Sequence, residues 1–108
     1  RATTHWAYHE ELRRFGAEPV RARVVRDGRL FTGGGVTAGI DFALTVLAEL
    51  GGDALAQAVQ LGIEYDPAPP FDAGAPDRAP AAVRLAVDTR FEARLADFRA
   101  AAARIPPG

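Results

Sequence analysis

The sequence predicts an α/β fold made of a short strand, a β-hairpin and several helices. Three observations carry this prediction: period-two alternation around a tight turn in residues 20–32, an apolar run in residues 40–50, and a stripe of apolar residues at helical spacing near the C-terminus. A chain of 108 residues is long enough for one small domain and too short for two.

The first two expected elements are a strand and a helix. Residues 2–5 contain two β-branched threonines, which favour a short strand that ends at His5. In residues 6–15 the apolar and aromatic residues recur at helical spacing, with charged residues between them. We expect Gly16 to end this helix, because glycine readily adopts the left-handed conformation found at helix C-termini.

The β-hairpin is predicted from a change in periodicity. From Val20 to Val24 apolar residues alternate with arginines, as they do in a strand with one buried face. Asp27-Gly28 then favours a tight turn, and the second strand follows at residues 30–32.

Two helices are expected after the hairpin. The run from Ile40 to Leu50 is apolar on nearly every side, which predicts a buried helix. A glycine pair separates it from a second helix, which Asp53 should cap and which extends toward Tyr65. Because the predicted strands are too few to cover the first helix, we expect its partners to come from chain outside this sequence or from another copy.

The remaining sequence predicts a loop and a long helix. Residues 66–80 are rich in proline and should form an extended surface loop, because proline ends helices and cannot occupy a central strand. Pro80 then opens an amphipathic helix that ends before Pro106-Pro107. Its apolar stripe consists of Val83, Val87, Phe91, Leu95 and Phe98.

Composition excludes several classes of function. The formal net charge is -1, and the 13 basic residues, all arginine, alternate with acidic ones, so we expect a solvated surface and no nucleic acid or membrane partner. No apolar run approaches the roughly 20 residues that a membrane span requires, and no leader pattern is present, which favours a cytoplasmic protein. The chain has no Cys and no Ser, and therefore contains neither a thiol nor a serine nucleophile. The lack of Met suggests a piece of a longer protein.

Candidate chemistry concentrates at His5 and at the glycine run 33–35. Glycines at the start of a helix let an anion approach N–H groups that carry partial positive charge, although the run matches no nucleotide-binding motif and a simple tight turn is the alternative. His5, at the end of a strand, occupies a position from which α/β folds project catalytic side chains; a core histidine bonded to the backbone is the alternative. His9 lacks a third ligand, so no metal site is predicted, and Asp41 is expected to act structurally at a helix N-terminus.

Four segments of the chain together resemble the C-terminal half of the ThiJ/PfpI superfamily, and one of them resembles its isonitrile hydratase branch. These segments are residues 1–6, 20–32 and 32–44 and, for the hydratase branch, 60–72. The resemblance implies a class I glutamine amidotransferase-like fold, in which residues 1–108 are the C-terminal portion of one doubly wound, flavodoxin-like sandwich. The N-terminal portion of that domain would carry a nucleophilic cysteine on a sharp turn shortly before Arg1.

The same resemblance implies an activity, a site and partners. The activity would be that of a hydro-lyase that hydrates a small isonitrile to an N-substituted formamide without a cofactor, and the protein would form a homodimer through residues near Trp6 or the helix after Gly35. His5 would take the catalytic position, and the substrate would be bound by Thr4, Gly34, Gly35, Val36 and Thr37. Alternatives are a deglycase, chaperone or peptidase-like activity on the same site, or the sensor domain of an AraC-type regulator, which would need a following helix-turn-helix module.

Overall fold

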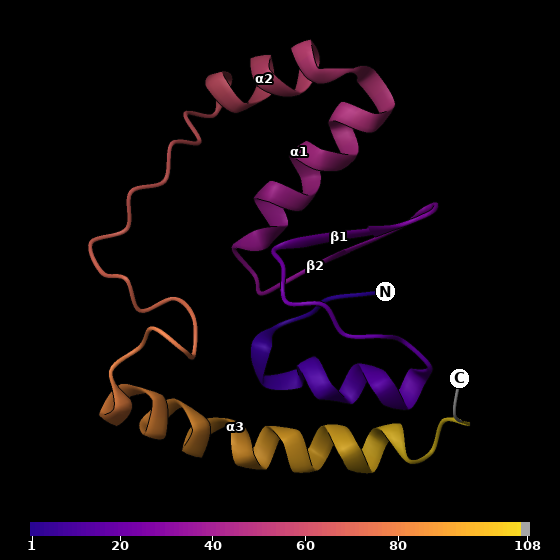
Figure 1. The fold of residues 1–108 in the computed structure, drawn as a ribbon, viewed down its shortest axis with the longest axis vertical. Helices are drawn as coiled ribbons and strands as arrows, with labels where there is room; N and C mark the ends of the chain where they lie inside the picture. The colour runs from indigo at the N-terminus through magenta and orange to yellow at the C-terminus, as the bar shows by residue number, and fades with distance from the viewer. Residues whose placement is uncertain (107–108) are drawn as a thin grey trace.

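The structure, a computed structural model that describes residues 1–106, is a thin plate of 43 × 37 × 18 Å (Figure 1). Its elements are the 3-10 helix η1 (Trp6–Phe15), strands β1 (Val24–Asp27) and β2 (Leu30–Gly33), and helices α1 (Ala38–Gly51), α2 (Asp53–Gly62) and α3 (Ala81–Ala102). A radius of gyration of 16.2 Å exceeds the value of about 13 Å expected for a compact domain of this length. The described residues are therefore loosely assembled.

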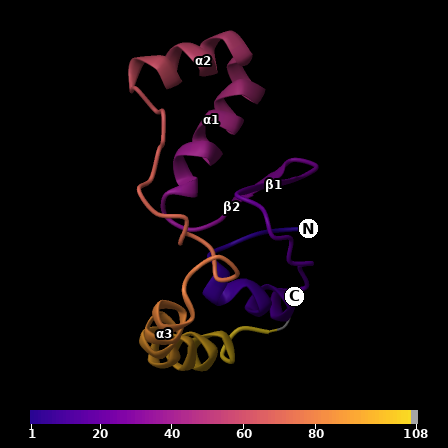
Figure 2. The same ribbon diagram turned by 60° about the vertical axis from the view of Figure 1, so that its left-hand side comes forward.

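The elements form two groups, which the N-terminal segment joins. Helices η1 and α3 lie side by side at one end of the plate, while the hairpin, α1 and α2 form the other end (Figures 1 and 2). The proline-rich loop runs down one edge from α2 to α3 as an extended segment, as predicted. In residues 1–106 no helix has the length and apolar character needed to cross a membrane.

The strand expected at residues 2–5 is reduced to a single parallel bridge between Ala2 and Pro19. Two hydrogen bonds make this bridge, from the Ala2 N–H to the Glu18 carbonyl at 2.9 Å and from the Val20 N–H to the Ala2 carbonyl at 2.8 Å. Because no further backbone within residues 1–106 pairs with the segment, the regular strand does not extend to His5.

The helix expected at residues 6–15 has the predicted bounds but a tighter winding. It is a 3-10 helix, and its first turn is closed by a 3.0 Å hydrogen bond from the Tyr8 N–H to the His5 carbonyl three residues earlier. Gly16 ends it in the left-handed conformation, with φ of 81°, which confirms the role predicted for this glycine.

The hairpin is confirmed with a corrected register. Asp27 pairs with Leu30, so the two turn residues are Gly28-Arg29 and not Asp27-Gly28. The φ of +62° at Gly28 suits a turn whose first central residue is left-handed. The first strand begins at Val24, four residues later than the alternation suggested, because Val20 is engaged by the N-terminal segment and the chain bends at residues 22–23.

Helices α1 and α2 are separate, as predicted, and the break lies at Gly52, whose φ of 90° is left-handed. Asp53 does not cap α2: Gly52 occupies the N-cap position and no side chain accepts a hydrogen bond there. Within the described residues α1 is largely exposed, as expected from the shortage of strands to cover it. Ile40 is 40% exposed and Leu50 81% exposed, because the hairpin and α2 contact only part of the helix surface.

The buried residues are small. Within residues 1–106 no large side chain is fully buried, and those that are mostly buried are Ala2, Thr3, Val25, Ala38, Ala56 and Ala102. The long helix α3 is confirmed, and its stripe from Val87 to Phe98 is half-buried against η1 through aromatic contacts. Val83, at the start of the stripe, is 49% exposed.

The exposed apolar surface leads to a test of independent folding. Residues 1–108 on their own should show no cooperative monomeric unfolding transition, because burial of small side chains contributes too little to offset the conformational entropy lost on folding. Circular dichroism melts with size-exclusion chromatography on the isolated segment measure this. A sharp transition from a monomer would contradict the prediction.

Candidate functional site

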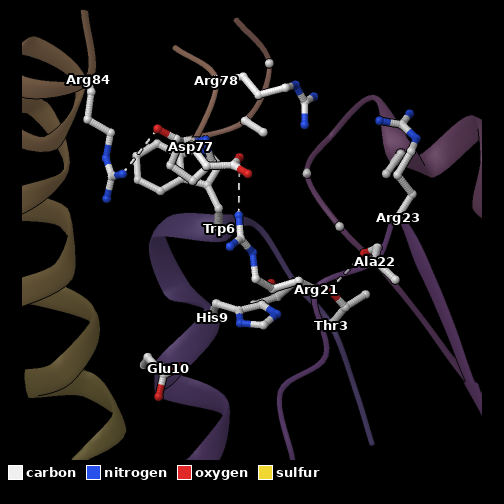
Figure 3. A pocket seen from close by; sticks show the side chains of 17 residues that line it. Thr3, Trp6, His9, Glu10, Arg21, Ala22, Arg23, Asp77, Arg78 and Arg84 are labelled. Carbon is white, nitrogen blue, oxygen red and sulfur yellow. Dashed lines mark hydrogen bonds and ion pairs between the residues drawn. The ribbon is translucent and has the colours of Figure 1, made fainter. Parts of the chain in front are cut away.

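An open pocket of about 740 Å³ lies between the N-terminal segment, η1, the glycine run and the loop before α3 (Figure 3). Thr4, Gly34 and Gly35 line it, which places three of the predicted substrate-binding residues together. Val36 and Thr37 follow directly in the chain but lie outside its lining, and Val36 is 96% exposed. The pocket is also lined by Trp6 and by four arginines that the sequence did not group.

The glycine run offers backbone N–H groups beginning at Gly35, one residue later than expected. The Gly34 N–H already donates to the Arg23 carbonyl at 2.8 Å, so it is not available to a ligand. Within residues 1–106 the N–H groups of Gly35, Val36 and Thr37 donate to no protein acceptor. These groups precede α1, where the backbone carries partial positive charge.

The absence of a side chain at Gly35 allows the backbone to approach the His5 ring closely; it does not serve an unusual backbone angle. Neither Gly34 nor Gly35 has a left-handed φ, although the chain turns at residues 35–37. A Cβ at Gly35 would lie 3.2 Å from the Cδ2 of His5, tighter than an ordinary contact. A Cβ at Gly34 would make only ordinary contacts, the nearest at 3.5 Å from the Ala38 Cβ. Gly35 therefore brings the helix N-terminus up to the His5 ring.

His5 caps η1 through its side chain, so its ring is hydrogen-bonded to the backbone, as one of the two predicted alternatives has it. Its Nδ1 accepts a hydrogen bond from the Ala7 N–H at 3.1 Å, so the neutral ring carries its proton on Nε2. Burial lowers the pKa of His5 below its ordinary value of 6.5, which favours the neutral ring at pH 7. His5 is thus set to donate a hydrogen bond from Nε2, and not to accept a proton there.

Thr3 joins the N-terminal segment to the hairpin, although the sequence offered no sign of this role. It is only 4% exposed, its N–H donates to the Thr32 Oγ1 at 3.0 Å, and its own hydroxyl donates to the Ala22 carbonyl at 3.0 Å. Threonine is common in strands, so its presence at this position predicts no special role. Its hydrogen-bond partners, Thr32 and Ala22, lie far away in the sequence, so no local pattern connects them with Thr3. These two bonds hold Thr4 and His5 against the glycine run.

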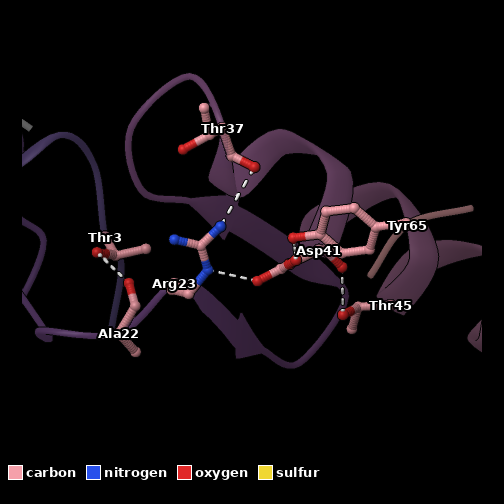
Figure 4. Close-up of polar contacts among 7 residues, drawn as sticks. All are labelled: Thr3, Ala22, Arg23, Thr37, Asp41, Thr45 and Tyr65. Carbon is pink, nitrogen blue, oxygen red and sulfur yellow. Dashed lines mark hydrogen bonds and ion pairs between the residues drawn. The ribbon is translucent and has the colours of Figure 1, made fainter. Parts of the chain in front are cut away.

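Asp41 belongs to a polar network that fixes the first turn of α1 (Figure 4). Its carboxylate accepts from the Arg23 guanidinium and from the Tyr65 hydroxyl, and Arg23 also donates to the Thr37 carbonyl at 3.2 Å. The hydroxyl of Tyr65 and the guanidinium of Arg23 lower the pKa of Asp41, while Asp41 raises the pKa of Tyr65. Asp41 also lies outside the pocket lining, so the network supports the structural role predicted for it.

The four arginines of the pocket come from separate parts of the sequence and are each paired with a carboxylate. The pairs are Arg21–Asp77 at 3.4 Å, Arg23–Asp41, Arg78–Asp72 at 2.8 Å and Arg84–Asp88 at 3.3 Å. All four arginine side chains are substantially exposed, and exposed ion pairs stabilise a fold weakly. The arginines do gather in space, but as solvated pairs and not as an open anion-binding patch.

His9 is held by the backbone, with its Nε2 3.0 Å from the Val20 carbonyl oxygen. Among residues 1–106 no group of three His, Asp or Glu side chains is placed to hold a metal ion.

The chain is similar in sequence and in structure to known proteins. Residues 1–49 match the model of the DJ-1/PfpI family. An isonitrile hydratase from Pseudomonas putida is 70% identical over 83 residues, which are 77% of this chain and 36% of that protein. Residues 1–49 therefore belong to the DJ-1/PfpI family. A crystal structure of a ThiJ/PfpI family protein from Pseudomonas syringae is also similar, with a TM-score of 0.80 and 51% identity over 83% of this chain and 37% of the other.

These findings confirm the family inferred from the sequence and a mixed α/β architecture of four helices and a hairpin in residues 1–106. The chain spans little more than a third of the length of either relative. The part that matches the DJ-1/PfpI model contains each of the candidate site residues, from Thr4 to Thr37, whereas α2, the proline-rich loop and α3 lie beyond it.

Replacing Tyr65 by Phe tests the network around Asp41. The loss of the hydroxyl donor should raise the pKa of Asp41 toward its ordinary value of 3.8 and lower the urea midpoint of the full-length protein at pH 7. Because the folded pKa lies below the unfolded one, the stabilisation is complete above about pH 5 and is lost as the pH falls through the folded pKa. The difference from wild type should therefore shrink near pH 2.

Tyr8→Phe provides the matched control for this test, because the Tyr8 hydroxyl makes no hydrogen bond within residues 1–106. Equal midpoints for wild type and Tyr65→Phe at both pH values would show that the network does not stabilise α1.

Proposed function

We propose that the protein hydrates isonitriles to N-substituted formamides, with a cysteine thiolate supplied by a part of the DJ-1/PfpI domain outside residues 1–108. The observation that carries the substrate class is the 70% identity to an isonitrile hydratase over 83 residues. The geometry that supports a role for this chain is the approach of Gly35, whose backbone lines the pocket, to the ring of His5, which is not itself among the lining residues. No metal or organic cofactor takes part in the proposed reaction.

The proposed reaction has two steps. In the first, the thiolate sulfur attacks the terminal carbon of R–N≡C and the same carbon gains a proton, which gives a thioimidate, R–N=CH–S. In the second, water adds to that carbon, the nitrogen gains a proton and the C–S bond breaks, which releases R–NH–CHO and the thiolate. The sum is one isonitrile and one water converted to one formamide.

Residues of this chain would stabilise charge in both steps. The N–H groups of Gly35 and Val36, without protein acceptors in residues 1–106, can donate to the thiolate or to the developing negative charge. The N-terminus of α1 lowers the pKa of a neighbouring thiol and so increases the thiolate fraction at neutral pH. Thr4 would line the space for the substrate.

His5 would act as a hydrogen-bond donor in this scheme. Its Nδ1 is engaged by Ala7, and burial keeps the ring neutral, so Nε2–H is the group that can reach a ligand. This role differs from a general base, for which the acceptor nitrogen would have to face the substrate.

We infer that residues 1–106 form part of a doubly wound sandwich whose other strands and helices cover α1. The exposed apolar side chains of α1, such as Leu50, and the TM-score of 0.80 to a chain much longer than this one support this placement. A cytoplasmic location remains an expectation from the sequence.

A homodimer is also proposed for the full-length protein. The predicted contact regions were Trp6 and the helix after Gly35; the Trp6 ring is contacted by Phe91 and by Arg84, whereas Ile40 of α1 is 40% exposed. We expect one or the other of these regions to contribute to the interface. Sedimentation at micromolar concentration measures the assembly, and a sample that stays monomeric would contradict it.

Gly35→Ala tests the proposed role of the glycine run. The added Cβ would force His5 or the helix N-terminus to move by a few tenths of an ångström, and we expect the turnover of a simple aryl isonitrile to fall by up to about a hundredfold, the effect of losing one donor to an anion. Formamide formation by the full-length protein and the pH dependence of thiol alkylation are the measurements.

Gly39→Ala is the matched control, because Gly39 lies in the first turn of α1 and a Cβ added there would meet nothing within 4 Å. This variant should keep its activity and gain up to about 1 kcal/mol of stability from helix propensity. If Gly35→Ala retained both turnover and thiol pKa, the glycines would serve packing alone. If the wild-type protein produced no formamide, the proposed function would be wrong.

A further inference from the structure

We propose that Phe91, on the long helix α3, positions the His5 imidazole in the candidate site. The two rings are stacked, with centroids 5.0 Å apart and planes inclined by 30°. The inference deepens the proposed function, because it rests on the assignment of His5 to the site. It adds a positioning residue from a helix that lies beyond residues 1–49, the part that matches the family model.

Phe91 is itself held by aromatic neighbours. Trp6 meets it edge to face with centroids 5.8 Å apart, and Tyr8 does so at 5.9 Å with an interplanar angle of 83°. Such pairs stabilise a defined mutual orientation, because the negative face of one ring attracts the positive edge of the other. The Phe91 ring therefore presents a fixed surface to His5.

The His5 ring is restrained on three sides. Phe91 stacks against its face, Ala7 donates to its Nδ1 at 3.1 Å, and the Gly35 backbone leaves only 3.2 Å between Cδ2 and an added Cβ. A flip of the His5 ring would break the hydrogen bond from the Ala7 N–H to Nδ1. A tilt of the ring would separate it from the face of Phe91. Nε2 is the ring nitrogen that these contacts leave without a partner in residues 1–106.

The stack also changes the medium around His5. Apolar contact excludes water from the ring, and burial lowers the pKa of His5 from 6.5. The charged or titratable groups that face this cluster are the Tyr8 phenol of η1 and two guanidinium groups of α3. Arg94 lies 5.5 Å from the Phe91 centroid, and Arg84 lies 5.5 Å from the Trp6 centroid. The glycine run contributes no charged side chain at this point.

Simple helix packing is the competing explanation, and the chain offers a matched control for it. Phe98 lies on the same helix and packs edge to face on Tyr8 at 5.4 Å and on Phe15 at 6.3 Å. It makes no ring contact with His5 in the described residues. Phe91→Leu and Phe98→Leu should weaken the attachment of α3 to η1 in similar ways, whereas only the first removes the stack.

The experiment follows the His5 ring in the full-length protein by NMR titration, together with the kinetics of aryl isonitrile hydration. In Phe91→Leu we expect the His5 ring protons to move downfield, through loss of the ring current, and the His5 pKa to rise toward 6.5. We expect kcat to fall about tenfold with KM nearly unchanged. Phe98→Leu should leave the His5 resonances and kcat as in wild type. Phe91→Tyr, which keeps an aromatic ring at this position, should also retain wild-type resonances and kcat.

Phe91→Met serves as a second variant if Phe91→Leu fails to fold, because methionine fills irregular apolar space without stacking as a ring. Equal changes at His5 in the Phe91 and Phe98 variants, or no change in the Phe91 variants, would overturn the proposal. The NMR readout is independent of turnover. His5 resonances that respond to Phe91 alone, in a protein without isonitrile hydration, would leave the positioning intact and reject the proposed function.

Discussion

The arrangement of the described residues depends on the two hydrogen bonds of Thr3. One part of the molecule consists of η1 and α3, the other of the hairpin, α1 and α2, and little apolar surface is buried between them. Thr3 donates to Thr32 on β2 and to the Ala22 carbonyl before β1, and it is nearly inaccessible to solvent. Buried and satisfied bonds of this kind define position well, because breaking one leaves an unpaired polar group inside the protein.

The candidate site lies at this junction. Thr4 and His5 follow Thr3 directly, and Gly35 comes shortly after the end of β2, so the two bonds determine how near the His5 ring comes to the helix N-terminus. The His5 ring stacks on Phe91 of α3, which belongs to the part formed by η1 and α3. It also faces Gly35, which belongs to the part formed by the hairpin, α1 and α2. A movement between the two parts would therefore alter the site before it disturbed any single element.

The elements of the fold were largely predictable because they arise from local sequence. The ends of η1, α1 and α3 follow from glycine and proline, which act through backbone conformation alone. The hairpin register was predicted one residue out, because Asp27-Gly28 and Gly28-Arg29 are both plausible turns and cross-strand pairing selects between them. The sequence also predicted that residues 1–108 alone cannot cover α1, and the structure leaves much of its apolar surface exposed because the hairpin and α2 contact only part of it.

The sequence by itself determined the order of the elements, because glycine turns and periodicity are local properties, and its short motifs carried the resemblance that proposed Thr4, His5 and Gly35 as site residues. Only the tertiary structure decided which groups lie together. It showed that the Gly34 N–H is occupied, that Nδ1 of His5 is engaged by Ala7, and that Phe91 stacks on that ring. The physical reason is that hydrogen bonds and ring contacts between distant residues depend on the folded path of the chain, which no local pattern records.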